Sequence, residues 1–576
     1  MTVLERLTSP ADVRALDEGM LDGLCAELRQ AIIATCGAVG GHLGASLGTV
    51  ELIVALHRVY RTPVDRLVFD VGHQAYAHKL LTGRAARMGT LRQEGGLAPF
   101  LDPIESPHDA FGAGHACTAV SVAVGMLEGL HRTGAPGQVV VIVGDGALTG
   151  GLTFEGLNHA AVASRGLVVV LNDNGMSIST NVGAVRAMLE HDARRFFEAL
   201  GFVYVGALDG HDVRGLVAAL RAAKASTKPV LLHVRTQKGR GFGPAEDDPQ
   251  TRGHAMGPYE LRDGKLVRTR GGRSTWSEAF ARTLEARLAV DERVVVITPA
   301  MLEGSSLVGL KARFPSRVFD VGIAEQHAVT FAAGLATTGL RPVVCVYSTF
   351  LQRAYDQLVH DVALPGLPVV FAVDRAGLVG ADGATHQGAF DVSFLRPLPG
   401  FSITSPVFAD ELEPLLDDAL RRGRPSVLRF PRGVLPEAVR PAGIAAPGAS
   451  RWLHRPGAAP LAFVSTGVTA LAALEAARPA GFGVLDAGDL AQLDGALVAE
   501  AASTGALVLA EEATPRGGLA DAVREVLVER RLSPKVRGLA LPVDHFVRHG
   551  EANAQRRALG LDAVGLARAA RELLAS

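Results

Sequence analysis

The stretch that decides the fold is Val139-Val-Val-Ile-Val143, Gly144-Asp-Gly146, a glycine-rich segment through Gly151, a second apolar run and then Leu171-Asn-Asp-Asn174. Short β-branched runs bounded by glycine predict buried strands, and a helical segment between them indicates a parallel βαβ unit. The carboxyl ends of neighbouring parallel strands lie side by side, which is where such sheets bind ligands. We therefore expect Asp145 and Asn174 to face one crevice.

The same alternation continues along the chain and predicts an α/β protein of three consecutive, mostly parallel α/β domains. We place these domains at residues 1–262, 275–435 and 451–576. Asp263–Ser274 and Pro436–Ser450 are expected to be linkers, and the Gly/Arg-rich stretch from Lys238 is expected to be a loop. The predicted strands are 139–143, 167–171 and 230–234 in the first block, 294–298, 343–347, 369–373 and 426–430 in the second, and 461–464, 506–509 and 536–541 in the third.

Composition excludes several classes of protein. The chain has 576 residues, and 58 Lys+Arg against 59 Asp+Glu give a net charge of −1, so no global field attracts nucleic acid or an anionic membrane. The 4 cysteines have no CxxC spacing, which indicates neither a disulfide framework nor a zinc site. The longest apolar runs fall far short of the roughly 18 residues that span a bilayer. We expect a cytoplasmic protein that binds neither nucleic acid nor membrane.

The residue types at the two strand ends suit a metal bound to a diphosphate. The side-chain oxygens of Asp145 and Asn174 and the backbone carbonyl of Met176 form an incomplete oxygen shell, which Mg²⁺ completes with diphosphate oxygens. The backbone N–H groups of Gly146 and Ala147 can approach the same diphosphate. The alternative interpretation is that Gly-Asp-Gly is merely a turn, since glycine turns follow many parallel strands.

Several longer strings stand out in the first two blocks. They are Gly40-Gly-His-Leu-Gly-Ala-Ser-Leu-Gly48, Asp70-Val-Gly-His-Gln-Ala-Tyr76, Gly114-His115, Ile323-Ala-Glu-Gln-His327, Tyr347 to Asp356, Asp374 to His386 and Arg429-Phe-Pro-Arg-Gly433. In these strings the chain resembles the 1-deoxy-D-xylulose-5-phosphate synthase family, which is transketolase-like and uses thiamine diphosphate. The resemblance is dense over the first two blocks, whereas the third matches only in layout and carries no chemistry in the family.

The resemblance places the family's catalytic glutamate at Glu325. Thiamine chemistry needs a carboxyl group that hydrogen-bonds a pyrimidine nitrogen, and burial beside a ring raises the proton affinity of such a group. Glu325 follows a predicted strand, Val318–Val321, and opens a predicted helix, Gln326–Ala336, so the cofactor is expected to lie across an interface between the first two blocks. For an isolated Glu the better explanation would be pairing with a helix dipole.

Several histidines stand in glycine-rich loops rather than on apolar helix faces. By resemblance, His73 and the stretch Gly114, His115 and Ala116 contact the cofactor, as does Phe242. We expect His42, His254 and His386 to face the reacting carbonyls as proton donors and acceptors. For any single histidine a purely structural role would be about as common.

A phosphorylated substrate needs fixed cations, and Arg suits bidentate contact with an oxyanion. The resemblance nominates Arg375 and Arg432, with Tyr347, Arg353 and Asp382 lining the same pocket. Most other arginines are expected to be solvated surface residues.

Three features depart from the family pattern. A long insertion that would follow Ala184 is largely missing, so a mobile lid is expected to be absent, with a change in rate or acceptor scope. Phe242 stands where the family often has Tyr. The third block lacks the usual Arg-Phe-x-Lys-Pro string, and Leu485-Asp-Ala-Gly-Asp-Leu-Ala-Gln stands there instead.

The resemblance implies a transferase that decarboxylates pyruvate and joins the two-carbon unit to D-glyceraldehyde 3-phosphate. The products would be 1-deoxy-D-xylulose 5-phosphate, which feeds isoprenoid, thiamine and pyridoxal biosynthesis, and CO₂. A homodimer that needs thiamine diphosphate and Mg²⁺ is expected. The alternatives are a diverged ketol or acyloin transferase with a different acceptor, and a catalytically silent scaffold.

Overall fold

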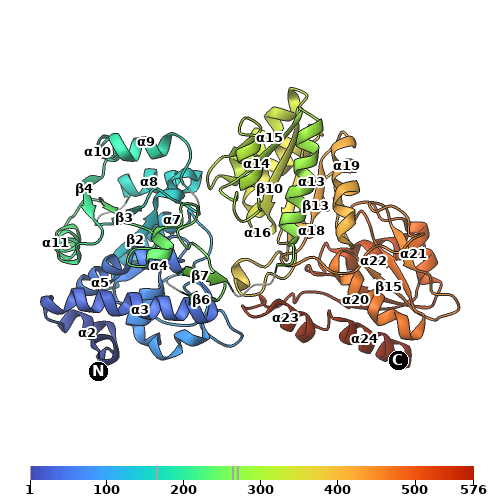
Figure 1. Cartoon of the computed structure of the whole chain (residues 1–576), viewed down its shortest axis with the longest axis horizontal. Coiled ribbons are helices and arrows are strands. Elements are labelled where there is room, and N and C mark those ends of the chain that lie inside the picture. Colours follow the sequence, from blue (N-terminus) through green and yellow to red (C-terminus); the bar gives the residue numbers. More distant parts are fainter. Residues whose placement is uncertain (1, 164–165, 179, 263–264, 269–271) are drawn as a thin grey trace. The chain divides into compact units, whose positions relative to one another are not determined.

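The computed structural model of the chain describes residues 2–163, 166–178, 180–262, 265–268 and 272–576. They form two compact units, Met1–Gly271 with Gly322–Ala324, and Gly272–Val321 with Glu325–Ser576. Among these described residues, a five-stranded and a two-stranded sheet lie in the first unit, and a six-stranded and a five-stranded sheet lie in the second (Figure 1). The predicted α/β class, built on mostly parallel sheets, is confirmed.

The first unit is built on a parallel sheet with strand order β1-β2-β3-β5-β4. Its strands are β1 (Arg66–Phe69), β2 (Val139–Gly144), β3 (Val168–Asp173), β4 (Val203–Asp209) and β5 (Val230–Arg235). Its helices are α1 (Val3–Arg6), α2 (Pro10–Ala15), α3 (Leu21–Val39), α4 (Leu43–Gly48), α5 (Val50–Val59), α6 (Tyr76–Lys79), α7 (Ala119–Thr133), α8 (Gly151–Ala163), α9 (Ala184–His191), α10 (Ala193–Ala199), α11 (Val213–Lys224) and α12 (Gly243–Glu246).

The two faces of this sheet bury separate apolar cores. Successive residues of a strand point to opposite faces. Accordingly, Val140 and Ile142 of β2 pack in a core with α3, α5 and α11, whereas Val139, Val141 and Val143 pack in another with α7, α8 and α10. This double burial explains why the strand appears in the sequence as an unbroken apolar run.

The predicted linker Asp263–Ser274 is wrong in part. Lys265–Arg268 forms a strand, β7, which pairs antiparallel with β6 (Tyr259–Arg262). The sequence does contain the signal, since Asp-Gly between two short alternating segments is a common hairpin connection. Residues 263–264 and 269–271 lie outside the described residues. The predicted loop from Lys238 is largely irregular, apart from the single helical turn α12.

The second unit holds a parallel sheet of order β12-β13-β11-β10-β8-β9 and a second sheet of order β14-β16-β15-β17-β18. Only the edge strand β14 of the second sheet runs antiparallel to its neighbour, among the described residues. The strands are β8 (Val294–Thr298), β9 (Val318–Asp320), β10 (Arg341–Tyr347), β11 (Val370–Asp374), β12 (Ser402–Thr404), β13 (Ser426–Arg429), β14 (Arg451–His454), β15 (Ala462–Ser465), β16 (Gly483–Asp486), β17 (Ala506–Ala510) and β18 (Lys535–Leu539).

Helices of the second unit cover both of its sheets. They are α13 (Trp276–Val290), α14 (Val308–Arg313), α15 (Glu325–Thr337), α16 (Ser348–Leu351), α17 (Tyr355–Gln357), α18 (Asp391–Leu395), α19 (Leu412–Arg421), α20 (Val468–Ala477), α21 (Gly495–Ala502), α22 (Leu519–Glu529), α23 (Ala552–Leu559) and α24 (Ala563–Ala575). One apolar core joins the two sheets, since it contains Val344 and Phe371 from one and Val464 and Leu507 from the other. Residues 436–450 contain neither helix nor strand, as predicted for that linker.

Candidate active site

Asp145 stands directly after β2 with its side chain buried, at 2% exposed. The Nδ2 of Asn181 donates to its Oδ2 at 2.8 Å, whereas its Oδ1 is buried without a hydrogen-bond partner. Burial, together with the carboxylate of Asp173, raises the pKa of Asp145 well above its usual range. A buried carboxylate oxygen without a donor needs a proton or a metal ion, which is the environment expected of a Mg²⁺ ligand.

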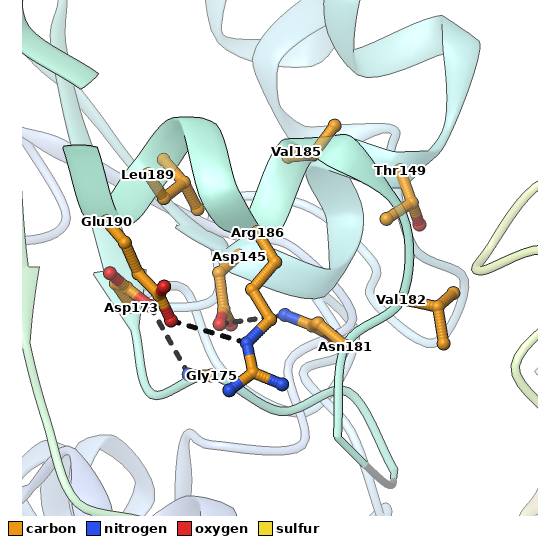
Figure 2. Close-up of a pocket in the computed structure, with 10 residues that line it drawn as sticks. All are labelled: Asp145, Thr149, Asp173, Gly175, Asn181, Val182, Val185, Arg186, Leu189 and Glu190. Atoms are coloured by element: carbon orange, nitrogen blue, oxygen red, sulfur yellow. Dashed lines mark hydrogen bonds and ion pairs between the residues drawn. The ribbon is translucent and has the colours of Figure 1, made fainter. Parts of the chain in front are cut away.

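A pocket of about 320 Å³ lies beside this carboxylate (Figure 2). Asp145 and Asp173 line it together with residues of α9, among them Arg186 and Glu190. The Nε of Arg186 donates to Oε1 of Glu190 at 3.3 Å. Where the family's long insertion would follow Ala184, a short helix therefore lies against the predicted metal ligand.

The end of β3 lies beside the end of β2, because Gly144 pairs with Asn172 in the parallel register. The Oδ1 of Asn174 accepts a hydrogen bond from the N–H of Met176 at 3.0 Å and closes a turn. Asp173, which the sequence did not single out, pairs through Oδ2 with Nε2 of His233 at 2.8 Å. The predicted adjacency of the two strand ends is confirmed.

Gly146 and Ala147 lie in a buried 3₁₀ turn, η4 (Asp145–Thr149). Their carbonyl groups are held by nearby hydroxyls: Thr149 Oγ1 donates to Gly146 O at 2.7 Å, and Thr153 Oγ1 donates to Ala147 O at 2.7 Å. These bonds fix the orientation of the peptide groups in the turn that the sequence predicted to meet a diphosphate.

Asp70, the residue after β1, anchors the backbone that directly follows the stretch Gly114–Ala116. The carboxylate of Asp70, at 2% exposed, accepts the N–H of Cys117 at 2.9 Å and that of Ala119 at 3.1 Å. Cys117 has a positive φ of 74°, which an L-residue adopts only when its surroundings hold it there. Gly114 and Ala116 are buried, and His115 is partly buried.

Three of the predicted histidines form one cluster. The rings of His42 and His73 lie 6.0 Å apart, those of His42 and His254 also 6.0 Å, and those of His73 and His254 5.2 Å. Burial, with a smaller contribution from the nearby Lys238 cation, lowers the pKa of His73 to about 3 and that of His254 well below its usual range. The Nδ1 atoms of His73 and His254 are buried without a hydrogen-bond partner, so both are available to a ligand.

The structure gives Lys238, beside this cluster, a contact that the sequence did not predict, and it places Phe242 in the apolar core. The buried Lys238, which sequence reasoning treated only as the start of a loop, donates from Nζ to the carbonyls of Ser177 at 2.8 Å and Ile178 at 3.1 Å. Phe242 packs in the apolar core, with its ring 6.1 Å from that of Tyr259. The sequence around Lys238, Gln237-Lys-Gly-Arg-Gly241, holds no signal for the first of these contacts.

In the second unit, Glu325 begins α15, and its side chain is 4% exposed. Burial raises its pKa, which the Arg353 guanidinium partly offsets. The Nη1 of Arg353 lies 3.2 Å from Oε2 of Glu325. The structure thus joins Arg353, predicted to line the substrate pocket, to the predicted catalytic glutamate.

Arg375, Arg432, Asp382 and Tyr347 come together as the sequence predicted. Arg432 Nη1 lies 2.7 Å from Asp382 Oδ2, and Arg375 Nη1 lies 3.8 Å from the same oxygen. The Arg375 guanidinium carbon stands 3.9 Å from the centre of the Tyr347 ring. Two guanidinium groups therefore share the carboxylate of Asp382, and guanidinium groups are the cations best suited to contact an oxyanion.

The Tyr347 hydroxyl is buried without a hydrogen-bond partner, and burial raises its pKa. His386 belongs to the same loop as Asp382. Its Nδ1 lies 2.8 Å from Thr385 Oγ1, and its ring meets that of Phe350 edge-on at 5.5 Å. The Tyr347 hydroxyl belongs to the ring against which Arg375 packs.

Comparison with known proteins covers the whole chain. The family model of 1-deoxy-D-xylulose-5-phosphate synthase matches residues 4–195, and the transketolase models for the thiamine diphosphate binding, pyrimidine binding and C-terminal domains match 131–275, 273–437 and 453–566. The 1-deoxy-D-xylulose-5-phosphate synthase of Myxococcus xanthus is 62% identical over 100% of this chain and 99% of its own length. This chain belongs to the 1-deoxy-D-xylulose-5-phosphate synthase family.

A second member of the family, from Anaeromyxobacter sp. strain Fw109-5, is 49% identical over 99% of this chain and 98% of its own length. The alignment with this second member spans 625 residues, whereas the alignment with the Myxococcus xanthus synthase spans 579. The shorter length of this chain is therefore shared by the Myxococcus xanthus synthase. Among solved structures, transketolase from Leishmania mexicana is 18% identical over 96% of this chain and 97% of that chain, with a TM-score of 0.45. Within the described residues, no helix is long and apolar enough to cross a membrane.

Proposed function

We propose that this chain catalyses the reaction for which its family is named. It decarboxylates pyruvate and joins the remaining two-carbon unit to D-glyceraldehyde 3-phosphate, giving 1-deoxy-D-xylulose 5-phosphate and CO₂. The observation that carries the proposal is the 62% identity to a synthase of that name over essentially the full length of both chains. No feature of the structure favours the alternative ketol or acyloin transferases.

The first unit supplies groups that fit a magnesium diphosphate. The unpartnered Oδ1 of Asp145 would contact Mg²⁺, with the side chain of Asn174 and the carbonyl of Met176 as further oxygen ligands. The N–H groups of Gly146 and Ala147, together with the stretch Gly114–Ala116, would contact the diphosphate oxygens. His73 would contact the cofactor through its unpartnered Nδ1.

Glu325 would hydrogen-bond the pyrimidine ring of the cofactor. When bound, thiamine diphosphate supplies the electron sink that decarboxylation of pyruvate requires. The raised pKa of Glu325 favours the protonated carboxyl group, which can donate to a ring nitrogen. Arg353, 3.2 Å from Oε2, fixes the orientation of that carboxyl group.

The histidines would handle protons at the reacting carbonyl groups. Since the pKa of His254 lies well below its usual range, this ring is neutral near pH 7 and offers one N–H donor and one nitrogen acceptor. His42 stands beside it, at 6.0 Å between ring centres. We propose that His42, His254 and His386 place and remove protons at the carbonyl oxygen of the acceptor aldehyde.

Arg375 and Arg432 would bind the phosphate of the acceptor. Asp382 holds both guanidinium groups, and the Tyr347 ring supports Arg375. A guanidinium group can donate two parallel, charge-assisted hydrogen bonds to two oxygens of a phosphate group. The pocket accordingly favours a phosphorylated aldehyde over a neutral one.

The remaining family properties are part of the proposal. We propose domains at 1–262, 275–435 and 451–576, a homodimer, and a cytoplasmic location. All four cysteines, Cys25, Cys36, Cys117 and Cys345, are free thiols buried in the structure, which suits a reducing compartment.

The test uses purified protein with thiamine diphosphate, Mg²⁺, pyruvate and D-glyceraldehyde 3-phosphate. We expect stoichiometric CO₂ release and a product with the mass of 1-deoxy-D-xylulose 5-phosphate. The absence of CO₂ release both with and without the aldehyde would refute the proposal. A strong preference for a non-phosphorylated acceptor would instead support the alternative transferase.

A further inference from the structure

Two of the predicted substrate residues, Arg375 and Asp382, lie on one loop of unusual backbone shape, residues 375–389, which we call the substrate loop. It connects β11 to α18 and carries Arg375, Asp382 and His386. Arg375 has a φ of 60°, a left-handed conformation that is unfavourable for a residue with a side chain. Such a shape persists only where the surroundings determine it.

Part of that support comes from hydrogen bonds within the loop and from Arg432, which follows β13. At the neck of the loop, Gly377 N donates to Gly388 O at 2.9 Å, and Gly388 N donates to Gly377 O at 2.7 Å. Arg432 holds the loop by donating to Val379 O at 2.9 Å. Inside the loop, Val379 N also donates to Gln387 Oε1 at 2.7 Å.

The C-terminal segments supply the remaining support, within the same compact unit. Hydrogen bonds that join these segments to the substrate loop include Leu378 N to Glu512 Oε2 at 3.1 Å, Thr514 N to Ala389 O at 2.8 Å, and Gln387 Nε2 to Val547 O at 3.3 Å. Leu378 is fully buried in a small apolar cluster with Leu541 and Leu561.

Backbone meets backbone at two glycines of the loop. A Cβ on Gly383 would lie 3.0 Å from the N of His549, and one on Gly380 would lie 3.1 Å from the O of Gly550. Gly550 N also donates to Gly380 O at 3.4 Å. The loop therefore fits closely against the 547–550 segment and has no space to adopt a different path there.

Among these contacts, the one from Glu512 brings a buried carboxylate against the loop backbone. Its side chain is 5% exposed and forms an ion pair with Arg556 of α23. The Oε2 that accepts the N–H of Leu378 also lies 3.3 Å from Nη2 of Arg556. A Cβ on Gly377 would come within 2.5 Å of that oxygen, so the carboxylate is placed directly against the loop backbone.

We propose that Glu512, held by Arg556, is a positioning residue for the acceptor site. It fixes the 377–380 arm of the substrate loop and thereby keeps Arg375 and Asp382 in the arrangement that receives the aldehyde phosphate. This inference rests on the proposed substrate roles of Arg375 and Asp382. It gives the C-terminal domain a function in substrate binding, although none of its side chains is expected to touch the substrate.

The test compares Glu512→Gln with Glu411→Gln in the full-length enzyme. Glu411 is a matched control, because it is fully buried, pairs with Arg451 at 2.6 Å and accepts the N–H of Val407 at 2.8 Å, all outside the loop. We expect Glu512→Gln to raise KM for D-glyceraldehyde 3-phosphate about tenfold, since a charged acceptor is replaced by a neutral one, with kcat and KM for pyruvate almost unchanged. Glu411→Gln should leave all three constants unchanged.

A second measurement does not depend on turnover. In hydrogen–deuterium exchange, the amide of Leu378 should exchange about tenfold faster in Glu512→Gln and at the wild-type rate in Glu411→Gln. Equal exchange in both variants, or an unchanged KM for the aldehyde, would overturn the inference. If the wild-type enzyme did not use this aldehyde at all, the proposed function would be refuted. The exchange rate of the Leu378 amide would still test whether Glu512 positions the loop.

A third variant serves if Glu512→Gln does not fold. Arg556 is 21% exposed, so Arg556→Ala leaves the carboxylate in place and removes its partner. We expect it to raise KM for the aldehyde, and Arg556→Lys, which keeps the positive charge, to restore most of the loss. Equal behaviour of the Ala and Lys variants would contradict the proposed role of the ion pair.

Discussion

Replacing Asp70 by Asn should weaken both the fold and the binding of thiamine diphosphate. The Asp70 carboxylate accepts two backbone N–H groups, from Cys117 at 2.9 Å and Ala119 at 3.1 Å. A hydrogen bond to a charged group contributes about 1.5–3 kcal/mol, and an amide oxygen would retain about 1 kcal/mol of one of the two. The free energy of unfolding should therefore fall by about 2–5 kcal/mol.

The effect on the cofactor follows from the same contacts. Asp70 fixes the conformation of the loop that carries Gly114 and His115. In the variant, part of the binding free energy of the cofactor must therefore be used to order this loop. Losing the equivalent of one such bond, about 1.4 kcal/mol, corresponds to a tenfold rise in Kd. Urea unfolding would measure the stability, and isothermal titration calorimetry with thiamine diphosphate and Mg²⁺ would measure the affinity.

Asp65→Asn is the matched control, because Asp65 precedes β1 as Asp70 follows it. Its buried carboxylate also accepts two backbone N–H groups, from Arg61 at 2.7 Å and Gln138 at 2.9 Å, and it pairs with Lys224 at 2.9 Å. It lies at the amino end of the strand, away from the strand ends that form the site. Equal Kd values in the two variants would refute the reasoning, whatever their stabilities.

Three further outcomes are expected. Glu325→Ala should lower kcat by about 10²–10⁴-fold in a CO₂-release assay while the protein still folds, and near-wild-type turnover would contradict its role. Arg432→Ala should raise KM for the aldehyde phosphate about 10–100-fold and leave KM for pyruvate unchanged, as measured by steady-state kinetics. The pKa of His73 is lowered to about 3, so its neutral form stabilises the fold above pH 6.5 and that stability is lost as the pH falls from 6.5 toward 3. Between pH 7 and pH 5.5, the free energy of unfolding measured with urea should therefore fall by about 1 kcal/mol less in His73→Gln than in the wild-type protein.

Patterns with a local cause were predictable from the sequence. The unbroken apolar runs gave strands such as Val294–Thr298 at their observed bounds, because both faces of those strands are buried. Short or interrupted strands were missed, as with β4, whose exposed and buried residues are mixed. The strand β7 was predicted to be part of the linker Asp263–Ser274, because it is short and stands between glycine-containing segments.

Contacts between distant segments were harder to foresee. The glycine-rich setting of His42, His73 and His254 indicated a shared role, and the structure confirms their proximity. Nothing local indicated that Lys238 reaches residues 177–178, because that contact depends on how two loops fold over the sheet. Arg353 was assigned from resemblance alone, and its pairing with Glu325 required the structure.

The core shared by the two sheets of the second unit limits how this chain can be divided. Every residue predicted to contact the cofactor, metal or substrate lies before residue 435, so a shorter protein would keep the whole set. A chain ending there would nevertheless expose the apolar side chains that now pack against Val464 and Leu507. Such a fragment would aggregate rather than act as a minimal enzyme. The C-terminal quarter of the chain is therefore inherited together with the chemistry it does not perform.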